Sequence, residues 1–327
     1  MQIADLHCDL LAYLAGGKNR DIIDRQALCS LPQLQEGDVG MQTLAIFTET
    51  GTGAVDSASR QMVCYRDILA LYGDLFKPLR DFTLVLDEKI TITPAIENLS
   101  GFSAEKEPLD LCFHRLERFF KELGLPLYVS LTWNSANRFG GGNQTKIGLK
   151  RDGELFLEYI DRRNIAIDLS HTSDQLAHGI LEYIDKKGLL IIPIASHSNC
   201  REVVNQPRNL SDVLIREIVV RGGVIGLNFV RSFIGSHPPE CFFLHVGHMR
   251  QLDALDHLCM GADFFYEGTV AHSLTALLPF FHKKYGDASC YPQLFEEFSH
   301  ILRFDEKEKL AHKNLESYFI RQKERVC

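Results

Sequence analysis

Residues 165–197 read IAIDLSHTSDQLAHGILEYIDKKGLLIIPIASH, and this stretch contains one complete repeat of the fold. It opens with a short apolar run, residues 165–171, and closes with another, residues 189–197. Between them, Ser173–Lys187 has the apolar spacing of an amphipathic helix, and Gly188 follows two lysines as a helix stop. A strand, a helix and a strand in this order predict two parallel strands joined by a crossover helix.

The same unit recurs along the chain. Eight apolar or β-branched runs are expected to form strands, at Ile3–Leu10, Met41–Thr48, Ile90–Glu97, Leu127–Trp133, Ile165–His171, Leu189–His197, Gly223–Phe229 and His257–Phe264. Helical patterns lie between them, clearest at Ser57–Phe76, Leu109–Leu123, Gly153–Arg163, Ser173–Lys187 and Leu210–Arg221. Eight such units predict an α/β fold, a (β/α)8 TIM barrel. A doubly wound open sheet is the alternative.

Two regions depart from the regular repeat. Residues 15–37 contain two adjacent glycines and a proline, and they show no clear long helix. Residues 271–327 have helical patterns at Leu294–Leu302 and Glu306–Gln322. We expect these to be extra C-terminal helices that complete the outer ring, in a single domain that spans residues 1–327.

Composition excludes several classes of partner. The formal net charge is −8 and no basic stripe is present, which argues against nucleic acid. The N-terminus lacks the basic and apolar segments of a signal peptide, and no uncharged apolar run reaches about 18 residues. We therefore expect no membrane partner. The nine cysteines form no CxxC pair, which favours reduced, mostly buried thiols in a cytoplasmic protein.

Imidazoles and carboxylates stand at the ends of five of the expected strands. They are His7 and Asp9, Glu97, His171, His197 and Asp263. The carboxyl ends of the strands meet at one mouth of a barrel, so these groups are expected to converge. Alternation puts His7 and Asp9 on one face of their strand and Cys8 on the other. A lone histidine or carboxylate at a strand end is more often a hydrogen-bonded residue or a helix cap, but six such groups together indicate metal binding.

The donor set favours zinc and would also accept manganese or cobalt, because it contains imidazole and carboxylate without thiolate. Six groups exceed one tetrahedral site, so two metals that share one carboxylate fit better. The residual positive charge of two divalent ions against three carboxylates favours a bridging hydroxide as nucleophile.

These residues resemble the membrane (renal) dipeptidase family of the amidohydrolase superfamily. The matching segments, in the order of the family, are Asp5-Leu-His-Cys-Asp9, Ala95-Ile-Glu97, Leu131-Thr-Trp-Asn134, Ile167-Asp-Leu-Ser-His171, Ser196-His-Ser-Asn199, Pro207-Arg-Asn-Leu210 and Gly261-Ala-Asp263. Together they cover about residues 3–265. The most telling signature is Ile-Asp-Leu-Ser-His followed some 26 residues later by Ser-His-Ser.

The resemblance implies a role for each of these side chains. His7 and Asp9 would bind the first zinc, Glu97 would bridge both ions, and His171 and His197 would bind the second. Asp263 would lie beside the first zinc as general base or proton shuttle. Arg208 would hold the carboxylate of the substrate, which suits the bidentate geometry of a guanidinium, although a surface salt bridge is the alternative for it. The resemblance also implies a homodimer.

Two positions depart from the pattern of the family. Family members carry a histidine where this chain has Trp133, and an indole N–H cannot accept a hydrogen bond or shuttle a proton. Trp133 is expected either to form a wall of the substrate pocket or to pack at the rim. After the last strand the family reads Asp-Phe-Asp-Gly, whereas this chain reads Asp263-Phe-Phe-Tyr266. The amine of the substrate is therefore expected to be recognised differently, or not to be free.

These observations predict zinc-dependent hydrolysis of dipeptides or dipeptide-like amides. One alternative is an amidohydrolase for another small amide, a lactone or an N-acyl amino acid. A second alternative is an inactive metal-binding homologue. His245 and His248 are three residues apart on an expected helix, but solvated positions or contacts between that helix and the barrel explain them better than metal binding. The run Gly140–Gly142 is expected to let a loop fold over the mouth, because no Lys-Ser/Thr pair follows it.

Overall fold

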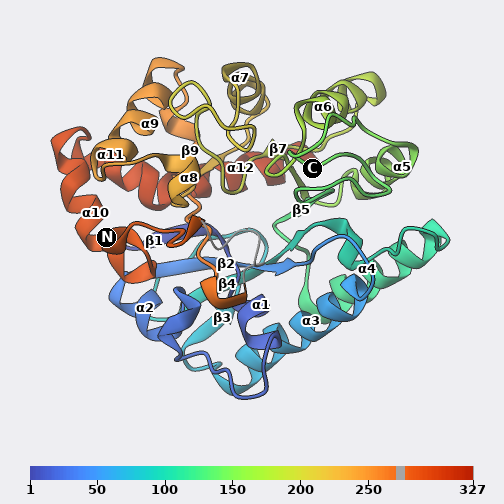
Figure 1. The fold of residues 1–327 in the computed structure, drawn as a ribbon, viewed down its shortest axis with the longest axis horizontal. Helices are drawn as coiled ribbons and strands as arrows, with labels where there is room; N and C mark the ends of the chain where they lie inside the picture. Colours follow the sequence, from blue (N-terminus) through green and yellow to red (C-terminus); the bar gives the residue numbers. More distant parts are fainter. Residues whose placement is uncertain (270–276, 327) are drawn as a thin grey trace.

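The computed structural model describes residues 1–269 and 277–326, and its central feature is a parallel barrel (Figure 1). The strands are β1 (Ile3–Cys8), β2 (Val39–Phe47), β3 (Phe76–Pro78), β4 (Ile90–Glu97), β5 (Tyr128–Ser130), β6 (Ala166–Asp168), β7 (Pro193–Ile194), β8 (Ile225–Leu227) and β9 (Leu258–Met260). Their order is β7-β6-β5-β4-β2-β1-β9-β8, and β3 pairs with β4 outside this path. A parallel bridge between Ala195 and Ile225 joins β7 to β8 and closes the ring. The chain therefore forms the expected (β/α)8 barrel rather than an open sheet.

Helices cover the outside of the barrel. They are α1 (Leu10–Ala15), α2 (Leu31–Glu36), α3 (Ala54–Leu71), α4 (Leu109–Leu123), α5 (Arg151–Ile160), α6 (Asp174–Lys187), α7 (Asp212–Val220), α8 (Arg231–Ile234), α9 (Glu240–Gln251), α10 (Tyr291–Glu297), α11 (Phe304–Glu308) and α12 (Asn314–Val326). The predicted starts and stops of α6 are present in the structure. The Ser173 hydroxyl accepts a hydrogen bond from the Leu176 amide at 3.0 Å, and Gly188 ends the helix at φ 62°.

The last helix closes the barrel at the amino ends of the strands, opposite the mouth. Leu315, Tyr318 and Phe319 of α12 pack with side chains inside the barrel such as Leu6 and Met41. Figure 1 shows α12 crossing behind the sheet. The Arg321 side chain donates to the carbonyl of Gly222, just before β8, at 2.9 Å. The C-terminal helices thus form part of the packed core.

Some element boundaries differ from the predictions. Strands β5 to β9 are shorter than expected, because residues at both ends of each predicted run lie outside the hydrogen-bonded ladder. Helix α3 starts three residues earlier and ends five residues earlier than the predicted Ser57–Phe76, and Phe76 begins the unpredicted strand β3. The predicted helix Glu306–Gln322 is interrupted by a π-helical turn at Lys309–Lys313. Residues 270–276 and 327 of the predicted C-terminal region lie outside the described residues.

The cysteines of the described residues are mostly buried, as expected. The eight cysteines within residues 1–269 and 277–326 are all free, and seven of them are buried. Within the same residues no helix combines the length and the apolar character that crossing a membrane requires.

Candidate metal centre and substrate pocket

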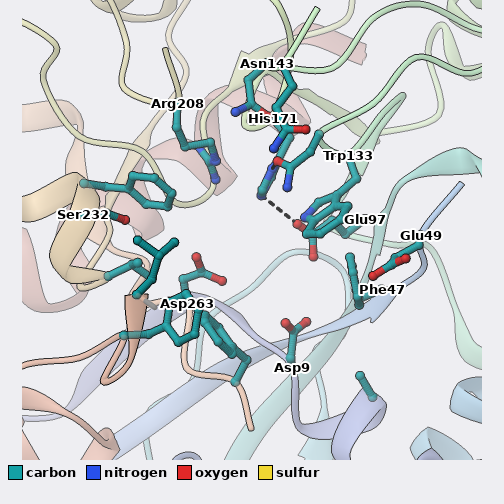
Figure 2. A pocket seen from close by; sticks show the side chains of 18 of the residues that line it. Asp9, Phe47, Glu49, Glu97, Trp133, Asn143, His171, Arg208, Ser232 and Asp263 are labelled. Carbon is teal, nitrogen blue, oxygen red and sulfur yellow. Dashed lines mark hydrogen bonds and ion pairs between the residues drawn. The ribbon is translucent and has the colours of Figure 1, made fainter. Parts of the chain in front are cut away.

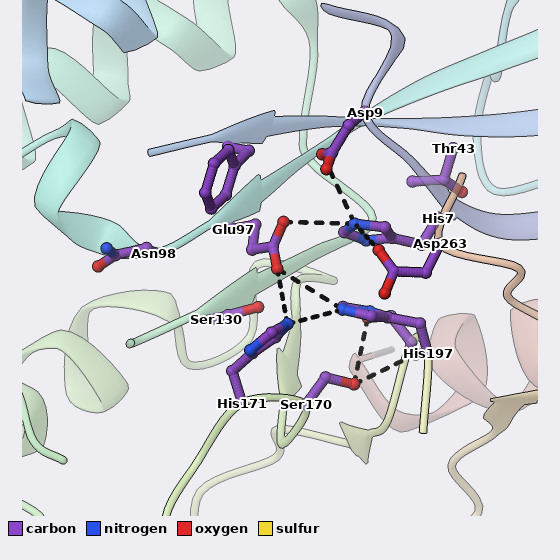
Figure 3. Close-up of polar contacts among 12 residues, drawn as sticks. His7, Asp9, Thr43, Glu97, Asn98, Ser130, Ser170, His171, His197 and Asp263 are labelled. Carbon is purple, nitrogen blue, oxygen red and sulfur yellow. Dashed lines mark hydrogen bonds and ion pairs between the residues drawn. The ribbon is translucent and has the colours of Figure 1, made fainter. Parts of the chain in front are cut away.

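The barrel brings the six predicted strand-end side chains to one mouth (Figure 3). His7 lies within β1 and Glu97 is the last residue of β4. Asp9 follows β1 directly, and His171, His197 and Asp263 lie three residues beyond the ends of β6, β7 and β9. His7 and His197 are fully buried, and Glu97 is 2% exposed. Residues separated by up to 256 positions in the sequence therefore form one compact polar group.

Glu97 lies at the centre of this group, with its two carboxylate oxygens facing opposite sides. Its Oε1 is 3.0 Å from His171 Nε2 and 3.5 Å from His197 Nε2. Its Oε2 is 3.3 Å from His7 Nε2. Glu97 therefore lies between His7 on one side and the pair His171 and His197 on the other.

His7 also lies close to the two aspartates of the group. Its Nε2 is 3.8 Å from Asp9 Oδ1 and 3.7 Å from Asp263 Oδ1. Two triads have donor atoms close enough to hold one ion each, namely His7 with Glu97 and His197, and His7 with Asp9 and Asp263. His7 Nε2 and Asp9 Oδ1 are buried without a hydrogen-bond partner. Buried polar atoms without partners are costly, so these two atoms fit a site that receives a cation.

The outer ring nitrogen of each histidine has a protein partner. His7 Nδ1 is 2.6 Å from the Tyr128 hydroxyl, and His171 Nδ1 is 2.9 Å from Asn134 Oδ1. His197 Nδ1 is 2.6 Å from the Ser196 hydroxyl. Such partners orient a metal-binding imidazole and leave its Nε2 directed inward.

The backbone is strained at two of these positions. His171 and Asp263 both have φ of 65°, a left-handed conformation that costs non-glycine residues on the order of 1 kcal/mol. At both positions the chain turns shortly after a strand, and the side chain faces the mouth. Asp9 occupies the N-cap position of α1, yet its side chain makes no capping hydrogen bond and points into the site instead (Figure 2).

Burial shifts the ionisation of five side chains of this group. It raises the pKa of Glu97 to about 8 and that of Asp263 to about 7. The pKa of Asp9 is raised well above its usual value, first by burial and then by the Glu97 carboxylate. Burial also lowers the pKa of His171 and His197 well below the usual 6.5. A bound cation reverses the effect on the carboxyl groups, because it favours their charged form, and it reinforces the neutral form of the imidazoles.

The raised carboxyl pKa values predict how the stability of metal-free protein depends on pH. Between about pH 6.5 and 8 folded Glu97 and Asp263 hold more protons than in the unfolded chain, so the free energy of unfolding falls as the pH rises. We expect a slope on the order of 1 kcal/mol per pH unit, measured by urea unfolding of chelator-treated protein. Protein with zinc added should lose this slope. A stability that is flat or rises across this range in the metal-free protein would contradict the prediction.

A pocket of about 570 Å³ opens above the metal group (Figure 2). Arg208 lines it and is only 4% exposed, so it is no surface salt bridge. Its Nη1 donates to the Ser198 hydroxyl at 2.7 Å, and its Nη2 donates to the His197 carbonyl at 2.9 Å. Its Nε is buried without a partner. The guanidinium is therefore fixed by two protein acceptors, and part of its hydrogen-bonding capacity is not used by them.

Aromatic side chains form much of the pocket wall. Trp133 lines the pocket, 5.1 Å from the Phe47 ring and 5.9 Å from the His171 ring between centroids. Phe265 and Tyr266, which replace the expected acidic segment, also line it. The loop after the three glycines contributes Asn143 and Gln144 to the lining. Within that loop Gly142 lies against the Trp133 carbonyl, where a Cβ atom would come within 1.9 Å.

Several functional candidates were missed in the sequence. Glu49 lines the pocket two residues beyond β2, and no motif marks it. Asn228 donates to Asp263 Oδ2 at 2.9 Å, and Tyr128 supports His7. A tyrosine inside a predicted strand has the pattern of an ordinary core residue, so nothing local distinguishes it.

The remaining histidines lie outside the site. His245 is fully buried, where its Nδ1 accepts from the Cys200 amide at 3.2 Å and its Nε2 contacts the Ile234 carbonyl at 3.1 Å. His248 Nε2 is 2.7 Å from Asp212 Oδ1 of α7. Both histidines therefore make hydrogen bonds that hold α9 against its neighbours on the outside of the barrel.

Residues 1–317, nearly the whole chain, match the family described as membrane dipeptidase (peptidase family M19). The chain belongs to this family. By family it is a metallo-dipeptidase, in agreement with the resemblance of its motifs.

Relatives of this membrane dipeptidase family member occur in bacteria and fungi. An uncharacterized protein in the pqqA 5' region of Klebsiella pneumoniae is 27% identical over 194 residues, which are 54% of this chain and 66% of that protein. An uncharacterized dipeptidase of Schizosaccharomyces pombe is 25% identical over 331 residues, with 90% of this chain and 74% of that protein covered. A metallo peptidase from Rhodobacter sphaeroides, crystallised with a phosphinate mimic of the dipeptide L-Ala-D-Ala, has the same fold. Its TM-score is 0.84 at 21% identity, and the match covers 98% of this chain and 99% of that one.

Proposed function

We propose that this protein hydrolyses the amide bond of dipeptides or dipeptide-like substrates with two zinc ions per chain. The observation that carries the proposal is the pair of donor sets on either side of Glu97, with Arg208 facing the same pocket. The ligand of the Rhodobacter sphaeroides protein, a dipeptide mimic, supports the substrate class.

The residues of the site fit a zinc pair. His7 and Asp9 would hold one ion, His171 and His197 would hold the other, and Glu97 would bridge them. His171 Nε2 and His197 Nε2 are 3.0 Å apart, close to the roughly 3.4 Å that separates two nitrogens bound at 2.0–2.1 Å in a tetrahedral zinc site. When bound, the metals supply a hydroxide nucleophile near neutral pH and polarise the amide carbonyl.

The protein supplies the proton transfer and the substrate orientation. Asp263 is a carboxylate at the edge of the metal group, 3.7 Å from His7 Nε2, and a carboxylate in this place can take a proton and return it. Asn228 holds its Oδ2, so that Oδ1 faces His7. In our proposal Asp263 removes the proton of the nucleophile and delivers it to the leaving nitrogen.

Arg208 is proposed to bind the C-terminal carboxylate, which favours dipeptides over longer chains. The Arg208→Ala variant should raise KM by about 10- to 100-fold, the range for a lost charge-assisted hydrogen bond. A dipeptide with an amidated C-terminus serves as control, because it lacks the carboxylate and should lose little from the substitution. Equal effects on the free acid and the amide would remove this role from Arg208.

Glu49 is proposed to bind the ammonium group of the substrate. Of the carboxylates that line the pocket it is the one outside the metal group, and no hydrogen bond or ion pair to its side chain is found among the described residues. In Figure 2 it lies on the opposite side of Glu97 from Arg208. The Glu49→Gln variant should raise KM severalfold for dipeptides with a free amine and leave KM unchanged for N-acetylated analogues. An equal change for both substrates would contradict this role.

A second candidate function is hydrolysis of N-acyl amino acids or other small amides. The aromatic wall of Trp133, Phe265 and Tyr266 favours it, because an acyl group requires apolar contacts where a dipeptide presents an ammonium. Both candidates use the same metal group and Arg208.

One experiment separates the functions. Zinc content by elemental analysis is combined with turnover on dipeptides, including D-residues at the C-terminal side, on N-acyl amino acids and on lactones. We expect two zinc ions per chain and the highest kcat/KM on dipeptides. Higher values on N-acyl amino acids would favour the second candidate. Two zinc ions without turnover of any substrate would indicate an inactive homologue and overturn the proposal.

Two further parts of the proposal concern the assembly and its compartment. The homodimer stays a prediction, which light scattering coupled to size-exclusion chromatography tests. The cytoplasmic location also stays a prediction, and fractionation of the source cells tests it.

A further inference from the structure

A chain of buried polar groups lies behind His197, outside the metal site. His197 Nδ1 is 2.6 Å from the Ser196 hydroxyl, and that hydroxyl is 2.8 Å from Oδ2 of Asp168 at the end of β6. All three residues are fully buried. Figure 3 shows His197 on the Ser170 side of the cluster, with its ring facing Glu97 and His171.

The donors around Asp168 determine the direction of these hydrogen bonds. Its carboxylate accepts from the backbone amides of Ser196 at 2.8 Å and Ser170 at 3.1 Å, and from the Ser130 hydroxyl at 2.7 Å. A carboxylate only accepts, so the single hydroxyl proton of Ser196 points to Asp168. Two neutral acceptors compete for this proton, the Ser170 hydroxyl at 3.4 Å and His197 Nδ1 at 2.6 Å. The hydrogen bond to the carboxylate is favoured over both because it is charge-assisted.

Because the Ser196 proton is directed to Asp168, the Ser196 oxygen must accept from His197 Nδ1–H. The imidazole then carries its proton on Nδ1, and the lone pair of Nε2 faces Glu97 and His171. We propose that Ser196 and Asp168 are positioning residues that hold His197 in its metal-binding tautomer. This proposal rests on the metal site of the proposed function, and it assigns the two residues no direct contact with substrate.

The supports of the other two histidines differ in chemistry. The Tyr128 hydroxyl donates to the Leu6 carbonyl at 3.1 Å, so it too accepts from its histidine, His7. His171 uses the side-chain amide of Asn134. The support of His197 leads through a single hydroxyl to a carboxylate, and the Tyr128 hydroxyl behind His7 also contacts that serine. Such a carboxylate increases the basicity of the imidazole that it supports.

The arrangement also connects the two strongest sequence signatures. Asp168 belongs to the same segment as His171, whereas Ser196 precedes His197 in the next strand unit. The segment that contains His171 therefore also supplies Asp168, the carboxylate that supports His197 in the other segment.

The test compares Ser196→Ala with a matched control, Ser130→Ala. Both serines are fully buried, and both donate to the same oxygen of Asp168, at 2.8 and 2.7 Å. Among the hydrogen bonds described for these two hydroxyls, a contact with a histidine ring is made by Ser196 and not by Ser130. Zinc affinity is measured by competition with a chromophoric chelator, and the ring nitrogens of 15N-histidine are observed by NMR in metal-free protein. The His197 signals are assigned by their loss in His197→Gln.

We expect Ser196→Ala to weaken binding of a zinc ion about 10- to 100-fold, the range for partners of metal-bound histidines, and Ser130→Ala to stay within about threefold of the parent protein. In the parent protein the NMR spectrum should show His197 protonated at Nδ1, and this preference should be lost in Ser196→Ala alone. Equal weakening in both variants, unchanged affinity in Ser196→Ala, or an Nε2-protonated ring in the parent protein would each overturn the proposal. Neither readout requires dipeptide hydrolysis, so failure of the proposed activity is distinguishable from failure of this inference.

Discussion

Replacing Asp263 by asparagine should lower kcat about 10²- to 10⁴-fold, the range for loss of a general acid–base group, and leave the zinc content unchanged. Asparagine keeps the size of the side chain and can still bond to Asn228, which contacts Asp263 Oδ2 at 2.9 Å. It cannot take up a proton from the nucleophile. The loss should therefore appear in kcat, while KM changes little.

Two measurements separate this effect from damage to the site. Elemental analysis should give the same zinc content for Asp263→Asn as for the parent protein, and the melting temperature with zinc should change little. If the variant loses a metal ion together with its activity, Asp263 acts as a ligand, as its place in a triad with His7 and Asp9 allows. If kcat is unchanged, Asp263 has no part in the proton transfer.

Replacing Glu97 by glutamine should weaken the binding of both zinc ions together. Each carboxylate oxygen faces a different group of histidines, at 3.3 Å on one side and 3.0 Å on the other. We expect zinc affinity to fall by more than about 100-fold. Residues that only hydrogen-bond to a metal ligand already contribute about 10- to 100-fold to the affinity. Activity should be lost in parallel, since neither ion would keep its shared ligand.

Without metal, we expect Glu97→Gln to leave the stability of the protein unchanged or to raise it. Burial raises the pKa of Glu97 to about 8, so the charged carboxylate destabilises the empty site, and a neutral amide relieves this cost. Metal-free Glu97→Gln should melt at the same temperature as the metal-free parent or higher. Zinc at 1,000 times its Kd should stabilise the parent by about 4 kcal/mol, and this gain should nearly vanish in the variant. A lower melting temperature without metal and an intact zinc response would show that Glu97 is structural.

The sequence predicted the barrel well because its signals are local. Apolar runs of strand length alternate with helical patterns such as Ser173–Lys187, and the caps of that helix, Ser173 and Gly188, lie where expected. Strand β3 was missed because only four residues separate Phe76–Pro78 from α3 and the strand is too short to show a period. The π-helical turn at Lys309–Lys313 was missed for a similar reason, since one extra residue in a helix barely disturbs the apolar pattern.

The group of six side chains was predictable because all of them lie at or close to the carboxyl ends of their strands, and barrel geometry converts that position into proximity. The pocket was less predictable. Trp133 had two possible positions in the sequence, and the structure places it in the wall beside Phe47 and His171. Glu49 carries no motif at all, and only the direction in which the loop after β2 leaves the barrel brings it to the pocket.

By itself, the sequence determined the repeat and the set of candidate ligands, because periodicity and strand ends depend on neighbouring residues. Only the tertiary structure decided that the strands close into a ring and how the candidate ligands are supported. Tyr128 reaches His7 across 121 positions, and Asp168 reaches Ser196 across 28. Such partners are selected by ring closure and side-chain rotamers, which bring together groups that share no local pattern.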